Sequence, residues 1–194
     1  MTSRPYHHGD LKAALLAAGI DILEAQGLDG LSLRAIAGRC GVSHSAPKNH
    51  FGSLRGLLTA IATEGFRRHA QTMCEGLGET ATRQQRLAAA MQGYADFAQA
   101  NPALFQLMFS KQHCDFADPA LLQAANASYA ILADISTGLD WAKAGLPDSQ
   151  TRTQMMLWSL VHGYASLRNA GLFDRLPEHP IGYILPASTY REES

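Results

Sequence analysis

Apolar residues recur at three- and four-residue intervals along nearly the whole chain, and no convincing segment alternates apolar and polar residues. The first spacing places side chains on one face of an α-helix, whereas alternation is typical of a strand. Pairs such as asparagine–proline and aspartate–proline separate the apolar segments, and these pairs break or cap helices. The pattern therefore predicts an all-α fold in two parts.

The breaks divide the chain into a series of predicted helices. Four are expected in the first part, over residues 11–27, 33–40, 44–50 and 54–76. Four more are expected after the glycine-containing stretch at 76–80, over about 81–100, 102–110, 118–142 and 148–171. Asp10, Ser32 and Ser43 precede the first three helices and are residue types that cap helix starts. Residues 176–194 contain three prolines and are expected to be irregular.

The helices at 33–40 and 44–50 are joined by a turn with a definite pattern. Ala37 and Gly41 are four residues apart, which suits a tight corner between two helices, because a small residue and a left-handed glycine are needed there. A small core is expected to form from Leu33, Ile36, Val42 and Phe51. This pattern indicates a helix-turn-helix whose second helix would enter the major groove of DNA. On the spacing alone, an ordinary helical hairpin is the alternative.

Charge is divided unevenly along the chain. Residues 1–70 hold eight Lys/Arg against five Asp/Glu, a formal charge of +3, whereas residues 71–194 hold eight against twelve, a formal charge of -4. The helix at 44–50 has no acid, as a surface facing phosphates requires, and it contains Pro47, which we expect to stiffen the helix four residues past the cap. Chance unevenness is the alternative, since +3 is modest for a nucleic-acid module.

Several classes of protein are excluded. Cys40, Cys74 and Cys114 are far apart and have no metal-site spacing, which favours a reducing cytoplasm and neither a disulfide framework nor a metal site. No apolar run reaches the roughly 18 residues of a membrane span, and because "MTSRPYHHGD" lacks the apolar segment of a signal peptide, we expect none. The usual catalytic and phosphate-loop motifs are absent, so we expect no enzyme, no catalytic residues and no cofactor. A protein-interaction domain, or a redox sensor acting through Cys114, is the alternative.

The segment "LSLRAIAGRCGVSHSAPKNHF" at 31–51, followed by "LRGLL", resembles the DNA-binding region of the TetR family of transcription regulators. The segment "YHHGDLKAALLAAGIDILEAQG" at 6–27 resembles the first helix of that region. Trp158, His162 and Gly163 resemble a subgroup that is named after those three residue types. The resemblance implies an all-helical homodimer, a palindromic double-stranded DNA operator and a C-terminal pocket for a small-molecule effector. We accordingly expect a helix-turn-helix domain at 1–55, a linking helix at about 53–75, and a ligand-binding and dimerisation domain at 76–194.

The sequence departs from the family at two positions. Lys48 stands where the family usually has an aromatic residue, and Leu54 stands where it usually has lysine. Lys48 keeps an attraction for phosphate but loses the positioning of an oriented hydroxyl. Arg55, the next residue after Leu54, is expected to supply the missing charge.

Ten residues are predicted to contact DNA. The helix starts at Ser32 and Ser43 offer hydroxyls and free amides to phosphates. We expect contacts with base edges from His44, Ser45 and Asn49, and contact with a thymine methyl from Ala46. The candidates for the phosphate backbone are Arg34, Lys48, His50 and Arg55. For each polar residue the alternative is a solvated surface side chain, and His50 has the further alternative of a place in the small core.

Aromatic and methionine side chains recur at helical spacing in the second part of the chain. Such stripes usually form a core, but they also line adaptable apolar cavities. The residues predicted to line an effector pocket are Met91, Tyr94, Phe97, Phe105, Met108, Phe109, His113, Tyr129, Trp158 and His162. From these features we expect a ligand-responsive regulator, and we favour a repressor that the effector releases from DNA.

The helix at 148–171 is apolar nearly all round, and Gly163 and Ala165 allow close helix contact. A helix of this kind must be buried on both sides. We expect one side to face its own domain and the other a symmetry mate, with a wholly internal helix as the alternative. Pairing of this kind would hold two recognition helices about 34–36 Å apart on DNA.

Overall fold

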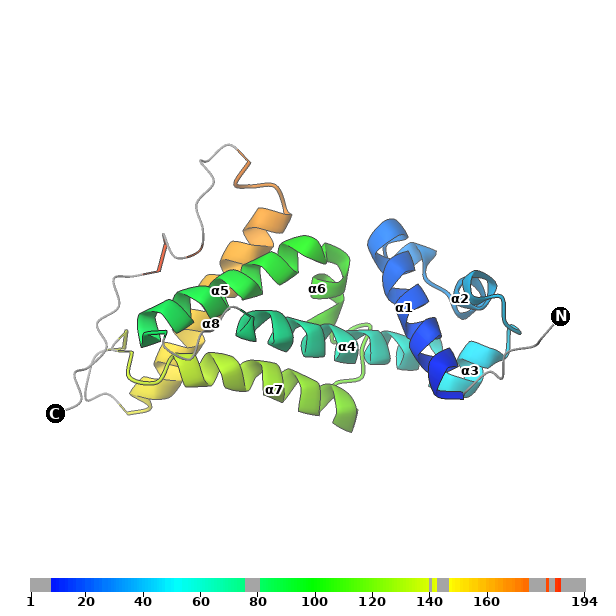
Figure 1. Ribbon diagram of the computed structural model, residues 1–194, viewed down its shortest axis with the longest axis horizontal. Coiled ribbons are helices and arrows are strands. Elements are labelled where there is room, and N and C mark those ends of the chain that lie inside the picture. Colours follow the sequence, from blue (N-terminus) through cyan, green and yellow to red (C-terminus); the bar gives the residue numbers. More distant parts are fainter. Residues whose placement is uncertain are drawn as a thin grey trace. The chain divides into compact units, whose positions relative to one another are not determined.

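The computed structural model describes residues 8–75, 81–139, 141–142, 147–174, 181 and 184–185 of the 194-residue chain. Its regular elements in these ranges are helices (Figure 1), and the predicted all-α fold is confirmed. They are α1 (His8–Gln26), the short 3-10 helix η1 (Leu28–Gly30), α2 (Leu33–Cys40), α3 (Ala46–Phe51), α4 (Leu54–Cys74), α5 (Arg83–Ala100), α6 (Pro102–Met108), α7 (Pro119–Ile135) and α8 (Ser149–Asn169). Within the described ranges, none of these helices is long and apolar enough to cross a membrane.

The chain forms two compact units. The N-terminal unit consists of Met1–Phe66 and Asn101–Ala124, and the C-terminal unit consists of Arg67–Ala100 and Ala125–Ser194. Helices α4 and α7 therefore contribute residues to both units. The predicted boundaries at residues 55 and 76 divide the chain by function, into a DNA-binding domain and a ligand-binding domain. This functional division stays a prediction.

The N-terminal unit is built around α1, which packs against α2, α3 and α6. Its core side chains are completely or almost completely buried, and the largest include Leu15, Leu23, Ile36, Leu57, Ile61 and Leu104. Glycine permits close approach between helices at one point. A Cβ added to Gly65 would lie 2.8 Å from the Met108 side chain and 3.0 Å from Leu104. Helices α4 and α6 therefore meet directly within this unit.

The predicted helix boundaries hold where a cap or a left-handed residue fixes them. The Ser32 hydroxyl accepts a hydrogen bond from the Ala35 amide at 3.1 Å, and Gly41 ends α2 at φ 65°. Both predictions are confirmed. The predicted cap Asp10 is wrong, because α1 already begins at His8.

Helix α7 ends seven residues before the predicted residue 142. The Ser136 and Thr137 hydroxyls both donate to the Ala133 carbonyl, at 2.8 Å and 3.2 Å. Gly138 follows with φ 81°, a conformation that does not continue a right-handed helix. Hydroxyls that bond to nearby backbone compete with the helix, and a left-handed glycine then stops it.

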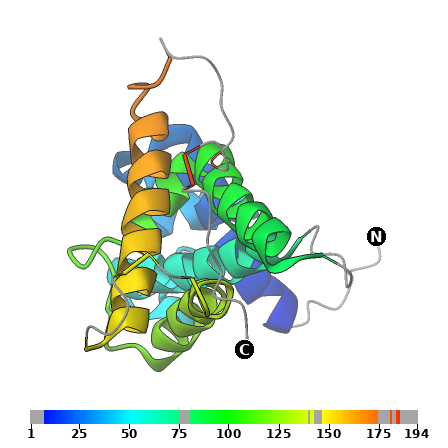
Figure 2. The same cartoon turned by 90° about the vertical axis from the view of Figure 1, so that its left-hand side faces the viewer.

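The C-terminal unit is dominated by the packing of α5 against α8 (Figure 2). Helix α5 also approaches the end of α4 closely, since a Cβ added to Gly93 would clash with the Thr72 carbonyl oxygen. Its core includes Met73, Leu87, Met91, Leu132, Leu157 and Val161. Segments of α4, α5, α7 and α8 thus each contribute buried side chains to the core of this unit.

Candidate functional site

The helix predicted to read DNA starts later than expected. Helix α3 begins at Ala46, its preceding residue Ser45 makes no side-chain cap bond, and the Ser43 hydroxyl lies 3.1 Å from that of Ser45. Ser43 is therefore not the helix cap, and the predicted start at residue 44 is wrong. The Ser43 carbonyl instead accepts the Ala46 amide at 3.0 Å, which closes a turn.

This start gives Pro47 a simple role. Pro47 occupies the first turn of α3, and its ring is buried. Amides in the first turn of a helix have no partner within the helix, so the missing N–H of proline costs no hydrogen bond there. Pro47 therefore lies in the first turn of α3 and not, as predicted, four residues past a cap. Its buried ring anchors α3 on its inner side.

Eight of the ten residues predicted to contact DNA are exposed, namely Ser32, Arg34, Ser43, His44, Ser45, Lys48, Asn49 and Arg55. The other two, Ala46 and His50, are half-buried. The His50 ring lies tilted against Phe51 with the ring centroids 6.3 Å apart, which agrees with a place at the edge of the small core. No residue of α3 is acidic, so its outer face presents hydrogen-bonding groups and positive charge.

Arg55 makes a contact that the sequence did not predict. Its guanidinium Nη2 donates to the carbonyl of Cys114 at 3.2 Å, within the N-terminal unit. The neighbouring Thr59 hydroxyl accepts the amide of Asp115 at 2.9 Å. The two residues of each pair are more than fifty positions apart, so no local pattern reveals the contact. The predicted phosphate contact of Arg55 stays a prediction.

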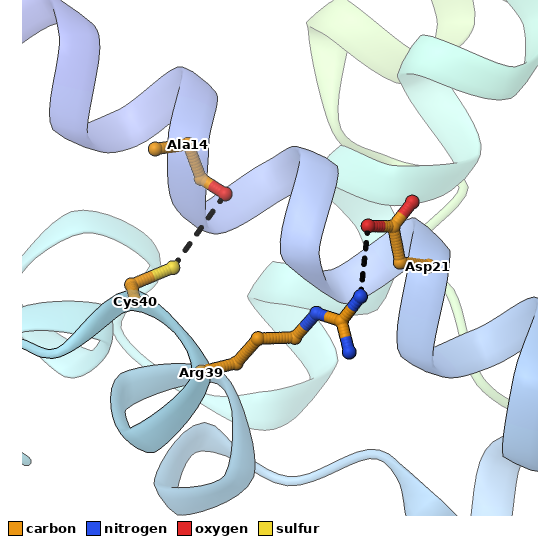
Figure 3. Close-up of polar contacts among 4 residues, drawn as sticks. All are labelled: Ala14, Asp21, Arg39 and Cys40. Carbon is orange, nitrogen blue, oxygen red and sulfur yellow. Dashed lines mark hydrogen bonds and ion pairs between the residues drawn. The ribbon is translucent and has the colours of Figure 1, made fainter.

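Two contacts fasten α2, the first helix of the helix-turn-helix, to α1 (Figure 3). Arg39 Nη2 lies 3.2 Å from Asp21 Oδ2 in an ion pair, and the Cys40 thiol donates to the Ala14 carbonyl at 3.7 Å. The ion pair is exposed at the surface and stabilises the fold only slightly. The contacts come from consecutive residues of α2, so they constrain how α2 lies on α1.

The cysteines do not favour a redox sensor. The Cys114 thiol is buried and donates to the carbonyls of Leu58 and Leu107, each at 3.6 Å. Burial raises the pKa of this thiol to about 11, so it stays protonated at neutral pH and is a poor nucleophile. In the part of the chain that the structure describes, no group of three or more His, Cys, Asp or Glu side chains is placed to hold a metal ion.

A polar cluster with buried His69, Tyr94 and Ser128 lies in the C-terminal unit. Tyr94 Oη lies 2.8 Å from Nδ1 of His162, and Nδ1 of His69 lies 2.8 Å from the Ser128 hydroxyl. The His69 ring stands edge-on to Tyr94, with the centroids 4.3 Å apart. The Trp158 indole, which can only donate, also hydrogen-bonds Tyr94. These side chains come from α4, α5, α7 and α8, so the cluster joins all four helices of the unit.

The cluster is uncharged at neutral pH. Burial, and to a smaller extent the nearby His162, lowers the pKa of His69 to about 3. Burial also lowers the pKa of His162 and raises that of Tyr94. His69 is absent from the residues predicted for this site, although its place in the apolar stripe of α4 with Phe66 and Met73 was an available signal.

The ten predicted pocket residues fall into two groups. Six belong to the C-terminal unit: Met91, Tyr94, Phe97, Tyr129, Trp158 and His162. Among these, Tyr129 lies beside Trp158 with ring centroids 5.7 Å apart, and its hydroxyl donates to Gln154 at 3.1 Å. Four belong to the N-terminal unit: Phe105, Met108, Phe109 and His113. The structure thus brings Tyr94, Tyr129, Trp158 and His162 together, and a shared role for all ten stays a prediction.

Helix α8 also presents an exposed apolar face. Met155 is 60% exposed, Met156 48%, Trp158 40% and Leu167 43%. Among the residues that the structure describes, none lies within 4 Å of a Cβ added to Gly163. The alternative of a wholly internal helix is therefore wrong. One side of α8 packs in the core of its unit, and the other is an apolar surface with a glycine in it.

Two family models match the chain. Residues 15–61 match the model described as "Bacterial regulatory proteins, tetR family", and residues 87–182 match the model described as "Tetracyclin repressor-like, C-terminal domain". Together these segments span most of the chain. None of the curated proteins compared with the chain matches it.

Solved structures share the fold. A protein of unknown function from Rhodococcus sp. RHA1 is 32% identical, aligns over 94% of this chain and 93% of its own, and has a TM-score of 0.74. A transcriptional regulator from the same organism is 22% identical over 89% of this chain and 90% of its own, with a TM-score of 0.62. The TetR family transcriptional regulator PfmR from Thermus thermophilus is 17% identical over 88% of this chain and 91% of its own, with a TM-score of 0.59. At identities this low, the last two comparisons show the fold alone.

Proposed function

This chain belongs to the TetR family of bacterial regulatory proteins, and on that premise we propose that it is a repressor that binds a palindromic operator as a homodimer and is released by a small-molecule effector. Members of the family are DNA-binding transcription regulators, not enzymes. We place its action in the cytoplasm, where it meets double-stranded DNA.

The outer face of α3 is the observation that carries the proposal. Its exposed residues include Lys48 and Asn49, its inner side is anchored by buried Pro47, and α2 is fixed on α1 behind it. Asparagine can bond adenine through two hydrogen bonds, and lysine attracts phosphate. We assign base contacts to His44, Ser45 and Asn49, a thymine methyl to Ala46, and phosphate contacts to Ser32, Arg34, Ser43, Lys48, His50 and Arg55.

The exposed face of α8 supports pairing of two copies. It combines large apolar side chains with Gly163, where no neighbour fills the space beside the helix. Two such faces bury apolar surface and allow close contact when they meet about a twofold axis. A dimer of this symmetry presents two recognition helices to the two halves of a palindrome.

The polar cluster of the C-terminal unit supports an effector site. Tyr94, His162 and Trp158 form a connected set of uncharged donors and acceptors on α5 and α8, with Tyr129 beside them. An effector that exchanges hydrogen bonds with this set would favour one arrangement of these helices. It can shift the equilibrium between DNA-bound and free states only by its difference in affinity for the two states.

The proposal is tested by binding of fluorescent DNA from the protein's own upstream region at several salt concentrations. We expect specific binding that weakens steeply as salt rises. Lys48→Ala should reduce the salt dependence by about two counterions per bound dimer, because each of the two protomers loses one phosphate contact. The matched control is Arg86→Ala, which removes an exposed cation of α5 and should leave the slope unchanged. Absence of specific binding at low salt would favour a protein-interaction domain instead.

A further inference from the structure

The first turn of α6 is held by a carboxylate from α1. The Leu104 amide donates to Glu24 Oε1 at 2.8 Å, and the Ala103 amide donates to Oε2 at 3.3 Å. The side chain of Asn101, which precedes the helix, makes no cap bond, and Pro102 has no N–H to donate. Glu24 therefore serves as the cap of a helix that lies about eighty residues later in the sequence.

This contact is stronger than an ordinary surface hydrogen bond. A carboxylate at a helix start is favoured by the helix dipole, and hydrogen bonds to an ionised acceptor are stronger than neutral ones. Glu24 is half-buried, so water competes less for its oxygens. Each oxygen takes one of the two amides, which fixes the direction of α6 relative to α1 and not only their distance.

Helix α1 passes this constraint on to the helix-turn-helix. Asp21 lies one turn before Glu24 and forms the ion pair with Arg39 of α2, and the Cys40 thiol bonds the Ala14 carbonyl (Figure 3). Helix α2 then leads through the left-handed Gly41 toward α3. A continuous set of contacts thus runs from the start of α6, through α1, to the helix that precedes the recognition helix.

The segment that follows α6 is fastened to the same unit. Cys114 accepts from Arg55, and the amide of Asp115 donates to Thr59, both on α4 just after the recognition helix. Residues 101–115 are therefore anchored at both ends to helices that flank the helix-turn-helix. If α6 turns, α1 must turn with it or the two bonds to Glu24 must break.

We infer that Glu24 is a positioning residue for DNA binding, which sets the orientation of the helix-turn-helix by joining α1 to the first turn of α6. The inference rests on the proposed function, because it assigns this contact a role in operator affinity. Glu24 is not among the residues to which we assign contacts with DNA. A change in α6 reaches the recognition helix through α1 by this route, in addition to the direct contact of α6 with α4.

The test compares Glu24→Gln with Asp29→Asn, which removes an exposed acid of η1 that lies in the same unit and takes no part in the contacts between α6, α1 and α2. Glutamine keeps the length of the side chain but presents an NH2 group, a donor, to one of the two amides. Operator affinity is measured on folded protein by fluorescence anisotropy at several salt concentrations. Pulsed electron spin resonance measures the distance between labels at Gly38→Cys on α2 and Gln106→Cys on α6, with Cys40 and Cys74 replaced by serine. Both label sites are exposed.

We expect Glu24→Gln to weaken operator binding at least about fivefold, the lower end of typical coupling between sites, with an unchanged salt slope. The distance distribution between α2 and α6 should broaden, whereas Asp29→Asn should change affinity less than about twofold. Lower stability with unchanged affinity and an unchanged distance distribution would reduce Glu24 to a simple cap and overturn the inference.

If Glu24→Gln does not fold, Glu24→Asp, which keeps the charge but shortens the reach, takes its place. If the wild type itself binds no operator, the proposed function fails and this inference falls with it. Specific binding by the wild type with no effect of Glu24→Gln overturns the inference alone.

Discussion

The buried His69 should make the stability of this protein depend steeply on pH below about 6.5. In the folded state burial lowers its pKa from 6.5 to about 3. Between these two values the unfolded chain binds a proton that the folded protein does not bind. The stabilisation is therefore fully present above pH 6.5, is lost progressively as the pH falls, and reaches its minimum near the folded pKa. The limiting slope is about 1.4 kcal/mol per pH unit, so about 2 kcal/mol is lost between pH 8 and pH 5.

The measurement is urea unfolding followed by circular dichroism at pH values between 8 and 5, for the wild type and for His69→Asn. Asparagine keeps a hydrogen-bonding group near the position of Nδ1 that faces Ser128, but it does not titrate. Carboxylates titrate in both proteins, so their contribution cancels in the difference. The difference in unfolding free energy between wild type and variant should shrink by about 2 kcal/mol from pH 8 to pH 5.

The control is His44→Asn, which makes the same replacement at an exposed position outside the cluster. Equal pH slopes for the wild type and His69→Asn would refute the reasoning. Such a result would mean that His69 takes up its proton in the folded protein as readily as in the unfolded chain, and hence that the cluster around Tyr94 is open to water.

Three further predictions concern other parts of the molecule. Ser32→Ala removes the cap of α2 and should lower the unfolding free energy by about 1 kcal/mol in urea titrations; an unchanged midpoint would contradict the cap. In a thiol-labelling time course on folded protein, exposed Cys74 should react first and buried Cys114, whose pKa is raised to about 11, should not react until urea unfolds the chain. Met155→Asp places a charge on the exposed apolar face of α8 and should shift sedimentation from dimer toward monomer, whereas Gln99→Asp on α5 should not.

The sequence allowed the helices to be predicted, because helical spacing and strong breaks act locally. Ser32 and Gly41 set the two ends of α2 through contacts within four residues, and both were identified. The start of α3 was missed because two serines precede it and either can cap. The structure uses the Ser43 carbonyl to close a turn and lets the helix begin at Ala46.

Long-range contacts account for what the sequence did not reveal. Glu24 looks like an ordinary polar residue of α1 until α6 is placed beside it, and Arg55 looks like a free cation until the Cys114 carbonyl is seen. Tyr94 and His162 were selected because of residue type, but their bond at 2.8 Å depends on how α5 packs on α8. Periodicity identifies the buried face of a helix and cannot identify which helix covers it.

The discontinuous make-up of the N-terminal unit has a consequence for how the protein is synthesised. The helices that carry the proposed reading surface leave the ribosome first, yet residues 101–124 complete the compact body to which they belong. Until that later segment emerges, the amides that Glu24 accepts and the carbonyl that meets Arg55 do not exist. A fragment cut after residue 76 would lack the same partners, so the shortest autonomous reader of DNA should extend to about residue 124.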